Sequence, residues 1–161
     1  MRLLVPPEIA VQLVDALARA GRREIGGILM GEHVGPDTFR IKALTIQSKG
    51  GTFAAFIRIV SEILAPLRLF FEETKHNYIK FNYLGEWHSH HSFALSPSGR
   101  DHTTMNDLMT DIHLGANFVN LLLVKLNDQG QLEGGVTVYQ AGKKPIDGSV
   151  IIERSITQAR I

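Results

Sequence analysis

The sequence contains no cysteine among its 161 residues. Disulfide bonds, thiol nucleophiles and zinc sites with cysteine ligands, such as those of nucleobase deaminases, are therefore excluded. A long uninterrupted apolar run is also missing near the start, where Pro6, Pro7 and Glu8 break the first segment. A segment this short and interrupted is not expected to act as a signal peptide or a membrane span. We therefore predict a cytoplasmic protein that has no membrane partner.

Neither sign of charge is in excess, because 17 Lys and Arg residues stand against 16 Asp and Glu residues, a formal net charge of +1. The overall charge therefore favours neither nucleic acid nor an anionic membrane as a partner. The content of 44% hydrophobic and 20% charged residues is ordinary for a globular domain of this length. We predict one domain over residues 1–161, in which residues 153–161 form a terminal tail.

Hydrophobic spacing and turn residues predict an α/β fold with a central mixed, largely antiparallel sheet flanked by helices. The expected helices are 7–20, 56–76 and 97–109. The expected strands are 3–5, 24–32, 39–47, 78–90, 116–126, 132–140 and 150–152. Residues 141–148 are expected to form a loop.

Glycine and proline disturb two of these expected elements. Gly26, Gly27 and Gly31 interrupt the first strand of a hairpin, which predicts a bulge or the close approach of another backbone. Pro66 lies inside the helix 56–76 and is expected to kink that helix or split it in two. The apolar stripe of the same helix fits a face that packs on the core, and a partly exposed partner-binding surface is the alternative.

The stretch 86–101 combines residue types that bind metals. His88 and His90 are two residues apart, so on a strand both imidazoles leave the same face. Asp101 lies eleven residues after His90, and the first turn of the helix 97–109 would return its carboxylate to the strand. Two imidazoles, one carboxylate and an open fourth position are typical of a catalytic zinc rather than a structural zinc.

Successive side chains of the strand 78–90 point to opposite faces of the sheet, which predicts the face of its other residues. Leu84 and Glu86 are expected on the face that carries the histidines, and Trp87 is expected on the opposite face. We expect Trp87 and Phe93 to pack around the site.

The residues His88, His90, Ser98 and Asp101 reproduce the H-x-H-x7-S-x-x-D pattern of the JAB1/MPN/Mov34 (JAMM) metalloproteases. Every fixed position of that pattern is present. Upstream, the segment REIGGILMG resembles the family's first strand, which bears a glutamate, and here that glutamate is Glu24. The chain thus resembles the single-domain bacterial JAB peptidases, which implies one MPN-type domain.

The resemblance implies a role for each of these residues. His88, His90 and Asp101 would hold zinc, and a bound zinc would activate water at neutral pH. Glu24 would accept the proton of that water and deliver it to the leaving amine. Ser98 would donate a hydrogen bond to the developing oxyanion. The plainer interpretations are a solvated charge for Glu24 and a helix cap for Ser98.

One position departs from the family pattern, because His91 stands where many members have proline. On an extended chain its side chain points away from that of His90, so we do not expect it to bind the metal. The remaining histidines are expected to be ordinary surface or half-buried residues: His33, His76, His102 and His113.

The resemblance covers the order of elements over residues 1–140. It implies a zinc-dependent isopeptidase that cleaves after the C-terminal glycine of a ubiquitin-like protein, in a bacterial ubiquitin-like or antiphage system. Residues 47–80 and 110–117 would form the sheet edge and the surface that bind this partner. A processing peptidase for a ubiquitin-like or sulfur-carrier precursor is one alternative. A non-catalytic MPN scaffold is another, although scaffold members typically lose the metal ligands that this chain retains.

Overall fold

The computed structural model describes residues 1–47, 60–91, 94–111 and 115–154. Its helices are α1 (Pro7–Ala20), α3 (Val60–Glu73) and α4 (Gly99–Thr110). Its strands are β1 (Arg2–Val5), β2 (Gly26–Gly35), β3 (Thr38–Leu44), β4 (Phe81–Ser89), β5 (Val119–Leu126), β6 (Leu132–Tyr139), β7 (Ile146–Asp147) and β8 (Ser149–Ile152). Each predicted helix and strand is present in the described part of the chain, with its ends moved by a few residues.

All eight strands form one mixed sheet in the order β7-β6-β5-β4-β2-β3-β1-β8. The pairs β1–β3, β1–β8 and β4–β5 are parallel. The other neighbouring pairs are antiparallel, so the prediction of a mixed, largely antiparallel sheet is confirmed.

The sheet curls until it is nearly a barrel. β7 and β8 lie at opposite ends of the strand order, yet only Gly148 separates them in the sequence. The amide of Gly148 donates to the Val136 carbonyl at 2.8 Å, and the next amide, of Ser149, donates to the Met1 carbonyl at 3.0 Å. The chain therefore passes directly from one edge of the sheet to the other. The expected loop 141–148 is corrected in one respect, because its end forms the short strand β7.

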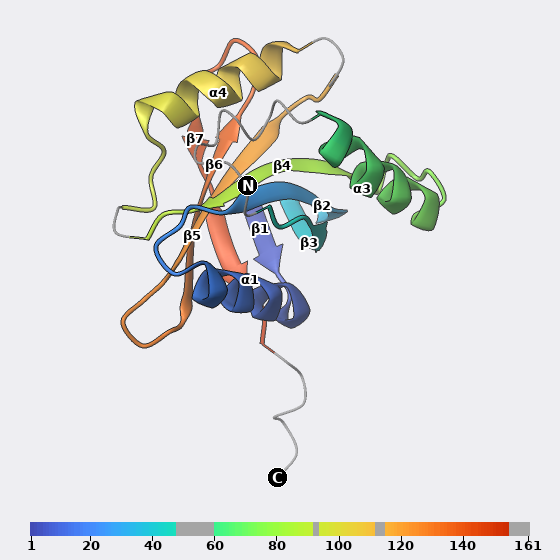
Figure 1. Cartoon of the computed structure of the whole chain (residues 1–161). Coiled ribbons are helices and arrows are strands. Elements are labelled where there is room, and N and C mark those ends of the chain that lie inside the picture. Colours follow the sequence, from blue (N-terminus) through green and yellow to red (C-terminus); the bar gives the residue numbers. More distant parts are fainter. Residues whose placement is uncertain (48–59, 92–93, 112–114, 155–161) are drawn as a thin grey trace.

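The helices cover the two faces of the sheet, and a hydrophobic cluster lies on each face. In Figure 1, α1 lies at the bottom and α4 at the top, with strands between them. Leu13 of α1 packs in the first cluster, which includes Trp87 of β4. Phe70 of α3 and Met105 of α4 pack in the second cluster, which includes Tyr83 of β4. β4 therefore contributes side chains to both hydrophobic clusters, and packing on both faces fixes its position in the sheet.

The helix α1 follows directly from its sequence. Its buried residues recur at helical spacing: Ile9, Leu13, Ala16, Leu17 and Ala20. Pro7 occupies the first helical position, where no backbone donor is needed. Gly21 ends the helix with φ of 58° and donates its amide to the Leu17 carbonyl at 3.1 Å.

The predicted close approach of backbones in the first hairpin is confirmed. A side-chain carbon on Gly26 or Gly31 would overlap a carbonyl oxygen of a neighbouring strand, and one on Gly27 would overlap the carbonyl oxygen of Thr45, just after β3. The pairing of β2 with β3 also shifts register between Met30 and Gly31. These glycines therefore allow neighbouring strands to pack tightly around β2.

The prediction that Leu84 shares a face with the histidines is wrong. Leu84 packs with Trp87 in the cluster under α1, on the face opposite the second cluster. The cause is Gly85, whose φ of 137° lies opposite a register shift in β2. This irregularity offsets the alternation by one residue, so that Tyr83 and Glu86 share a face and are joined by a hydrogen bond.

The helix α3 is continuous from Val60 to Glu73 even though it contains Pro66, so of the two effects expected of this proline, a kink or a split, the split does not occur. The predicted first residues of this helix, 56–59, lie outside the described residues. Phe70 is buried, whereas Leu64 and Leu69 are 57% and 56% exposed. The helix therefore packs on the core through the side that carries Phe70, and part of its apolar surface is exposed.

The C-terminal prediction is tested only in part. β8 is the edge strand expected at 150–152 and begins one residue earlier. Residues 155–161, which make up most of the predicted tail, lie outside the described residues. Among the helices that the structure describes, none is long and apolar enough to cross a membrane.

Candidate metal centre

Three side chains that bear typical metal ligands meet at the end of β4. One ligand atom each from His88, His90 and Asp101 lies within 4.8 Å of the other two. His88 and Asp101 are 6% and 4% exposed, and His90 is half-buried. The three residues that the sequence singled out as metal ligands are thus brought together in space.

The end of the sheet positions the two imidazoles. His88 lies in β4 between Gly26 of β2 and Leu123 of β5. β4 ends at Ser89, and the amide of His90 still donates to the Val124 carbonyl at 2.9 Å. The two imidazole rings lie 5.0 Å apart between centroids, at an angle of 73°. Backbone bonds on both sides of the pair therefore fix the positions of the rings.

A hydrogen bond selects the ligand atom of His90. Its Nδ1 lies 2.8 Å from the Ala94 carbonyl oxygen, which can only accept. Nδ1 therefore carries the proton, and Nε2 has the lone pair that a metal needs.

Asp101 uses its two carboxylate oxygens for different partners. Oδ2 accepts hydrogen bonds from the amide and the hydroxyl of Ser98, each at 2.7 Å. In return, the Asp101 amide donates to Ser98 Oγ at 3.2 Å, which completes a capping box at the start of α4. Oδ1 lies 3.2 Å from His88 Nε2. The helix cap thus aims one oxygen at the imidazoles.

The surroundings of Asp101 favour its charged form. Burial by itself raises the pKa of the carboxyl, but the hydrogen bonds from His88 and Ser98 outweigh burial. The pKa of Asp101 is therefore held well below its ordinary value of 3.8. A carboxylate that stays ionised at neutral pH can bind a cation without first losing a proton.

The donor set fits zinc. Ligand atoms bound to a tetrahedral zinc at ordinary bond lengths lie about 3.4 Å from one another. The separation of 3.2 Å between His88 Nε2 and Asp101 Oδ1 is close to this value. Two nitrogens and one oxygen also match the ligands of catalytic zinc sites, which keep a fourth position for water or substrate.

Ser98 has the capping role that the sequence offered as its plainer interpretation. Its hydroxyl donates to Asp101 Oδ2 and accepts from the Asp101 amide. Both hydrogen-bonding functions are therefore in use within the cap, and Ser98 is the N-cap residue. A hydrogen bond to an oxyanion would require its hydroxyl proton to turn away from Asp101.

Glu24 does not belong to the group of metal ligands, and its position relative to that group follows from the pairing of the segments that contain Ile25 and Ser89. Ser89 and Ile25 are joined by two hydrogen bonds, from the Ser89 amide at 2.8 Å and from the Ile25 amide to Ser89 Oγ at 3.0 Å. Glu24 precedes Ile25 and His90 follows Ser89, so continuation of this antiparallel register would bring Glu24 across from His90. The Glu24 side chain is exposed. This exposure fits the plainer interpretation of Glu24 as a solvated charge, and its catalytic role stays a prediction.

The other histidines do not join the three-residue group. His91 Nε2 lies 2.7 Å from the Arg23 carbonyl oxygen, as expected for a side chain that points elsewhere. His33 and His76 are exposed, as predicted. His102 is half-buried and bonded through Nδ1 to the hydroxyl of Tyr139 at 2.9 Å. His113 lies outside the described residues.

Trp87 does not pack around the site, which corrects the prediction. It is fully buried on the α1 face of the sheet, opposite to Glu86, and its Nε1 donates to the Thr45 carbonyl at 2.9 Å. The alternation along β4 places it on that face. Phe93, predicted to pack beside the site, lies outside the described residues.

Sequence reasoning gave no role to Glu86, although the structure makes it unusual. Glu86 is 2% exposed, and the Tyr83 hydroxyl donates to its Oε1 at 2.7 Å. Its Oε2 has no hydrogen-bond partner among the described residues. Burial raises the pKa of Glu86 to about 7, although the bond from Tyr83 lowers it. An acidic residue in the strand that carries the histidines, two residues before His88, was the signal that could have identified it.

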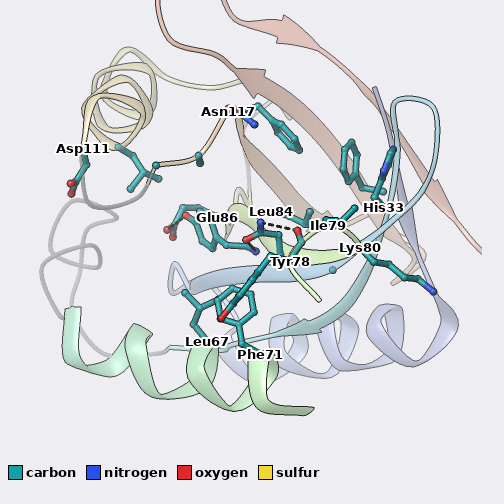
Figure 2. Close-up of a pocket in the computed structure, with 18 of the residues that line it drawn as sticks. His33, Leu67, Phe71, Tyr78, Ile79, Lys80, Leu84, Glu86, Asp111 and Asn117 are labelled. Atoms are coloured by element: carbon teal, nitrogen blue, oxygen red, sulfur yellow. Dashed lines mark hydrogen bonds between the residues drawn. The ribbon is translucent and has the colours of Figure 1, made fainter. Parts of the chain in front are cut away.

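A cavity of about 630 Å³ extends along this face of β4. Figure 2 shows His33 and Lys80 at one end of the cavity, Glu86 and Asp111 at the other end, and Leu67 and Phe71 of α3 along one side. Residues 115–118 line the opposite wall. Glu86 lines the cavity and lies two residues before His88, whereas His88, His90 and Asp101 do not line it.

Comparison with known proteins identifies the family of this chain and proteins that share its fold. The family model of the prokaryotic homologs of the JAB domain matches residues 6–133. No curated protein matches the chain. Among solved structures, the solution structure of protein DSY2949 from Desulfitobacterium hafniense is 13% identical, with a TM-score of 0.59. The match covers 98% of this chain and 97% of that one, which shows a shared fold. From the family match, the chain belongs to the prokaryotic homologs of the JAB domain.

Proposed function

We propose that this protein is a zinc-dependent isopeptidase that cleaves after the C-terminal glycine of a ubiquitin-like protein. The observation that carries the proposal is the group of His88, His90 and Asp101, in which the Ser98 cap holds one carboxylate oxygen and leaves the other facing His88. A scaffold protein has no need of this arrangement. We place the substrate in a bacterial ubiquitin-like or antiphage system by analogy with the family.

In this proposal each residue has a separate task. His88, His90 and Asp101 hold the zinc, which when bound polarises the scissile carbonyl and activates water. Glu24 removes a proton from the attacking water and returns one proton to the amine nitrogen as the amide bond breaks. The amine needs this proton because an unprotonated amide nitrogen is a poor leaving group.

Ser98 has a second task in the proposal. Its hydroxyl turns from Asp101 Oδ2 towards the oxygen of the carbonyl as negative charge develops there. The Ser98 amide keeps its bond of 2.7 Å to the same carboxylate oxygen, so Asp101 stays oriented meanwhile. One hydroxyl thereby fills the capping role and the oxyanion role at different times.

The cavity beside β4 supports a flexible tail as the substrate. It is lined by Leu64, Leu67 and Phe71 of α3 and by residues 115–118, which belong to or adjoin the two segments predicted to bind the partner. β5 begins at Val119 and pairs with β4 only from Gly85 onward. Among the described residues, the start of β4 thus has no strand beside it on that side. An extended tail can add there through main-chain hydrogen bonds.

The proposal is tested with purified, zinc-loaded protein and intact-mass spectrometry. Two substrates share one ubiquitin-like tail, joined in the first to a lysine ε-amine and in the second to a linear peptide extension. We expect cleavage after the tail glycine and faster cleavage of the lysine conjugate. The control is the Glu24→Gln variant, which should retain zinc and lose turnover.

Other outcomes identify the alternatives. Faster cleavage of the linear extension would favour a processing peptidase. Zinc-loaded protein that binds tails and cuts none of them would favour a scaffold and overturn the proposal.

A further inference from the structure

His91 links two segments that are far apart in the sequence. It follows the second ligand histidine directly, and its Nε2 lies 2.7 Å from the carbonyl oxygen of Arg23 and 3.4 Å from Ser89 Oγ. Arg23 immediately precedes Glu24 and lies 68 residues from His91. The end of β4 is thereby joined to the segment that leads into β2.

The backbone on either side of Glu24 is held from the segment that carries the ligands. On one side, His91 binds the Arg23 carbonyl. On the other side, Ser89 binds Ile25 through two hydrogen bonds, of 2.8 and 3.0 Å. Glu24 itself is exposed, and the position of its carboxylate therefore depends on the backbone from which it extends.

The chemistry of the link determines which atom carries the proton. A carbonyl oxygen only accepts hydrogen bonds, so His91 Nε2 must be the donor. Nε2 carries a proton both in this neutral tautomer and in the charged imidazolium. The link therefore persists in either protonation state, and its function is geometric.

We propose that His91 is a positioning residue that fixes the backbone at Arg23 and so holds Glu24 beside the metal ligands. This inference rests on the proposed function, in which Glu24 transfers the proton. A small displacement of a proton carrier lowers turnover on the order of 100-fold, because catalysis depends on near-ideal geometry.

Three substitutions at His91 separate the hydrogen bond from the shape of the ring. The amide nitrogen of glutamine extends about as far as Nε2 of histidine, whereas that of asparagine does not. Phenylalanine keeps the ring and removes the donor. We expect His91→Gln to keep kcat within about threefold, and His91→Asn and His91→Phe to lower kcat 10- to 100-fold. KM and zinc content should not change.

A double-mutant cycle tests whether the effect passes through Glu24. In the Glu24→Gln background, His91→Asn should not lower the residual rate further. If it lowers that rate as much as it lowers the wild-type rate, His91 does not act by positioning Glu24. Equal kcat values in all three His91 variants would also overturn the inference, as would a kcat in His91→Gln as low as in His91→Asn.

A second measurement does not depend on catalysis. Amide hydrogen exchange at Ile25, whose amide donates to Ser89 Oγ, is measured without substrate in the zinc-loaded protein and should accelerate in His91→Asn and stay unchanged in His91→Gln. Unchanged exchange in both variants would show that the link does not restrain this segment. Inactive wild-type protein with the expected exchange pattern would reject the proposed peptidase and leave the restraint established.

Discussion

The two carboxylate oxygens of Asp101 have different partners. Oδ2 accepts hydrogen bonds from the Ser98 cap, and Oδ1 faces His88. We predict that Ser98→Ala lowers stability by about 1 kcal/mol, the usual effect of losing an N-cap. It should also weaken zinc binding roughly 10- to 100-fold, because a carboxylate that binds a metal loses its supporting donor.

Urea denaturation and competition with a zinc chelator measure these two effects. The matched control is Ser98→Thr, which keeps the hydroxyl and should bind zinc like the wild type. Zinc affinity of the wild-type level in Ser98→Ala would show that the cap does not orient the ligand.

The buried carboxyl of Glu86 predicts a pH dependence of stability in the metal-free protein. Burial raises its folded-state pKa from 4.5 to about 7. Between these values the folded state keeps the proton and the unfolded state releases it, so stability falls as pH rises. Relative to Glu86→Gln, the wild type should lose on the order of 3 kcal/mol across this range.

The check is the free energy of unfolding of both proteins below pH 4.5, between 4.5 and 7, and above 7. The difference should level off at both ends of the range. A difference that is independent of pH would mean that Glu86 ionises normally in the folded protein.

At the scale of elements, the irregular geometry of β4 depends on Gly85. Its φ is 137°, and a side-chain carbon there would overlap the backbone of Asn120 in β5. We predict that Gly85→Ala lowers stability by roughly 3 kcal/mol or more, because strain and overlap act together. Gly35→Ala is the control, since open space surrounds Gly35 and its effect should be within about 1 kcal/mol. Thermal unfolding of both variants gives the comparison, and equal losses would contradict this account of β4.

The elements that could be predicted are those that local sequence determines. The helix α1 has its spacing, its proline and its final glycine within one short stretch, and Ser98 and Asp101 form their cap within four residues. The face of Leu84 could not be predicted, because it depends on the register shift at Gly85 between β4 and β2, two strands that are distant in the sequence. The link from His91 to Arg23 is equally non-local.

At the scale of the whole molecule, the cavity beside β4 predicts where substrate affinity arises. Leu64 and Leu69 of α3 are similarly exposed, at 57% and 56%, and Leu64 alone of the two lines the cavity. Leu64→Ser should raise KM for tail substrates on the order of tenfold and leave kcat unchanged. The lost contact would stabilise the bound substrate and the transition state equally. Leu69→Ser should change neither constant. Steady-state kinetics of both variants test this, and equal KM values would exclude the cavity as the tail site.

The overall assembly of the sheet was only partly predictable. Hydrophobic spacing and turn residues indicate a mixed sheet. The spacing of His88, His90 and Asp101 indicates that their side chains meet. The strand order and the near-barrel curl depend on pairings such as β1 with β8, which join the two ends of the described chain. No short stretch of sequence contains that information, and the same is true of the cavity, whose walls come from several distant segments.

The central claim is that His88, His90 and Asp101 form a zinc site, and the zinc content of the purified protein tests it most directly. The protein is loaded with zinc, desalted without chelator and measured by elemental analysis. We predict one zinc per chain in the wild type and in Glu24→Gln, and almost none in His88→Ala, His90→Ala or Asp101→Ala. Wild-type protein that retains no zinc, or ligand variants that retain as much as the wild type, would contradict the account.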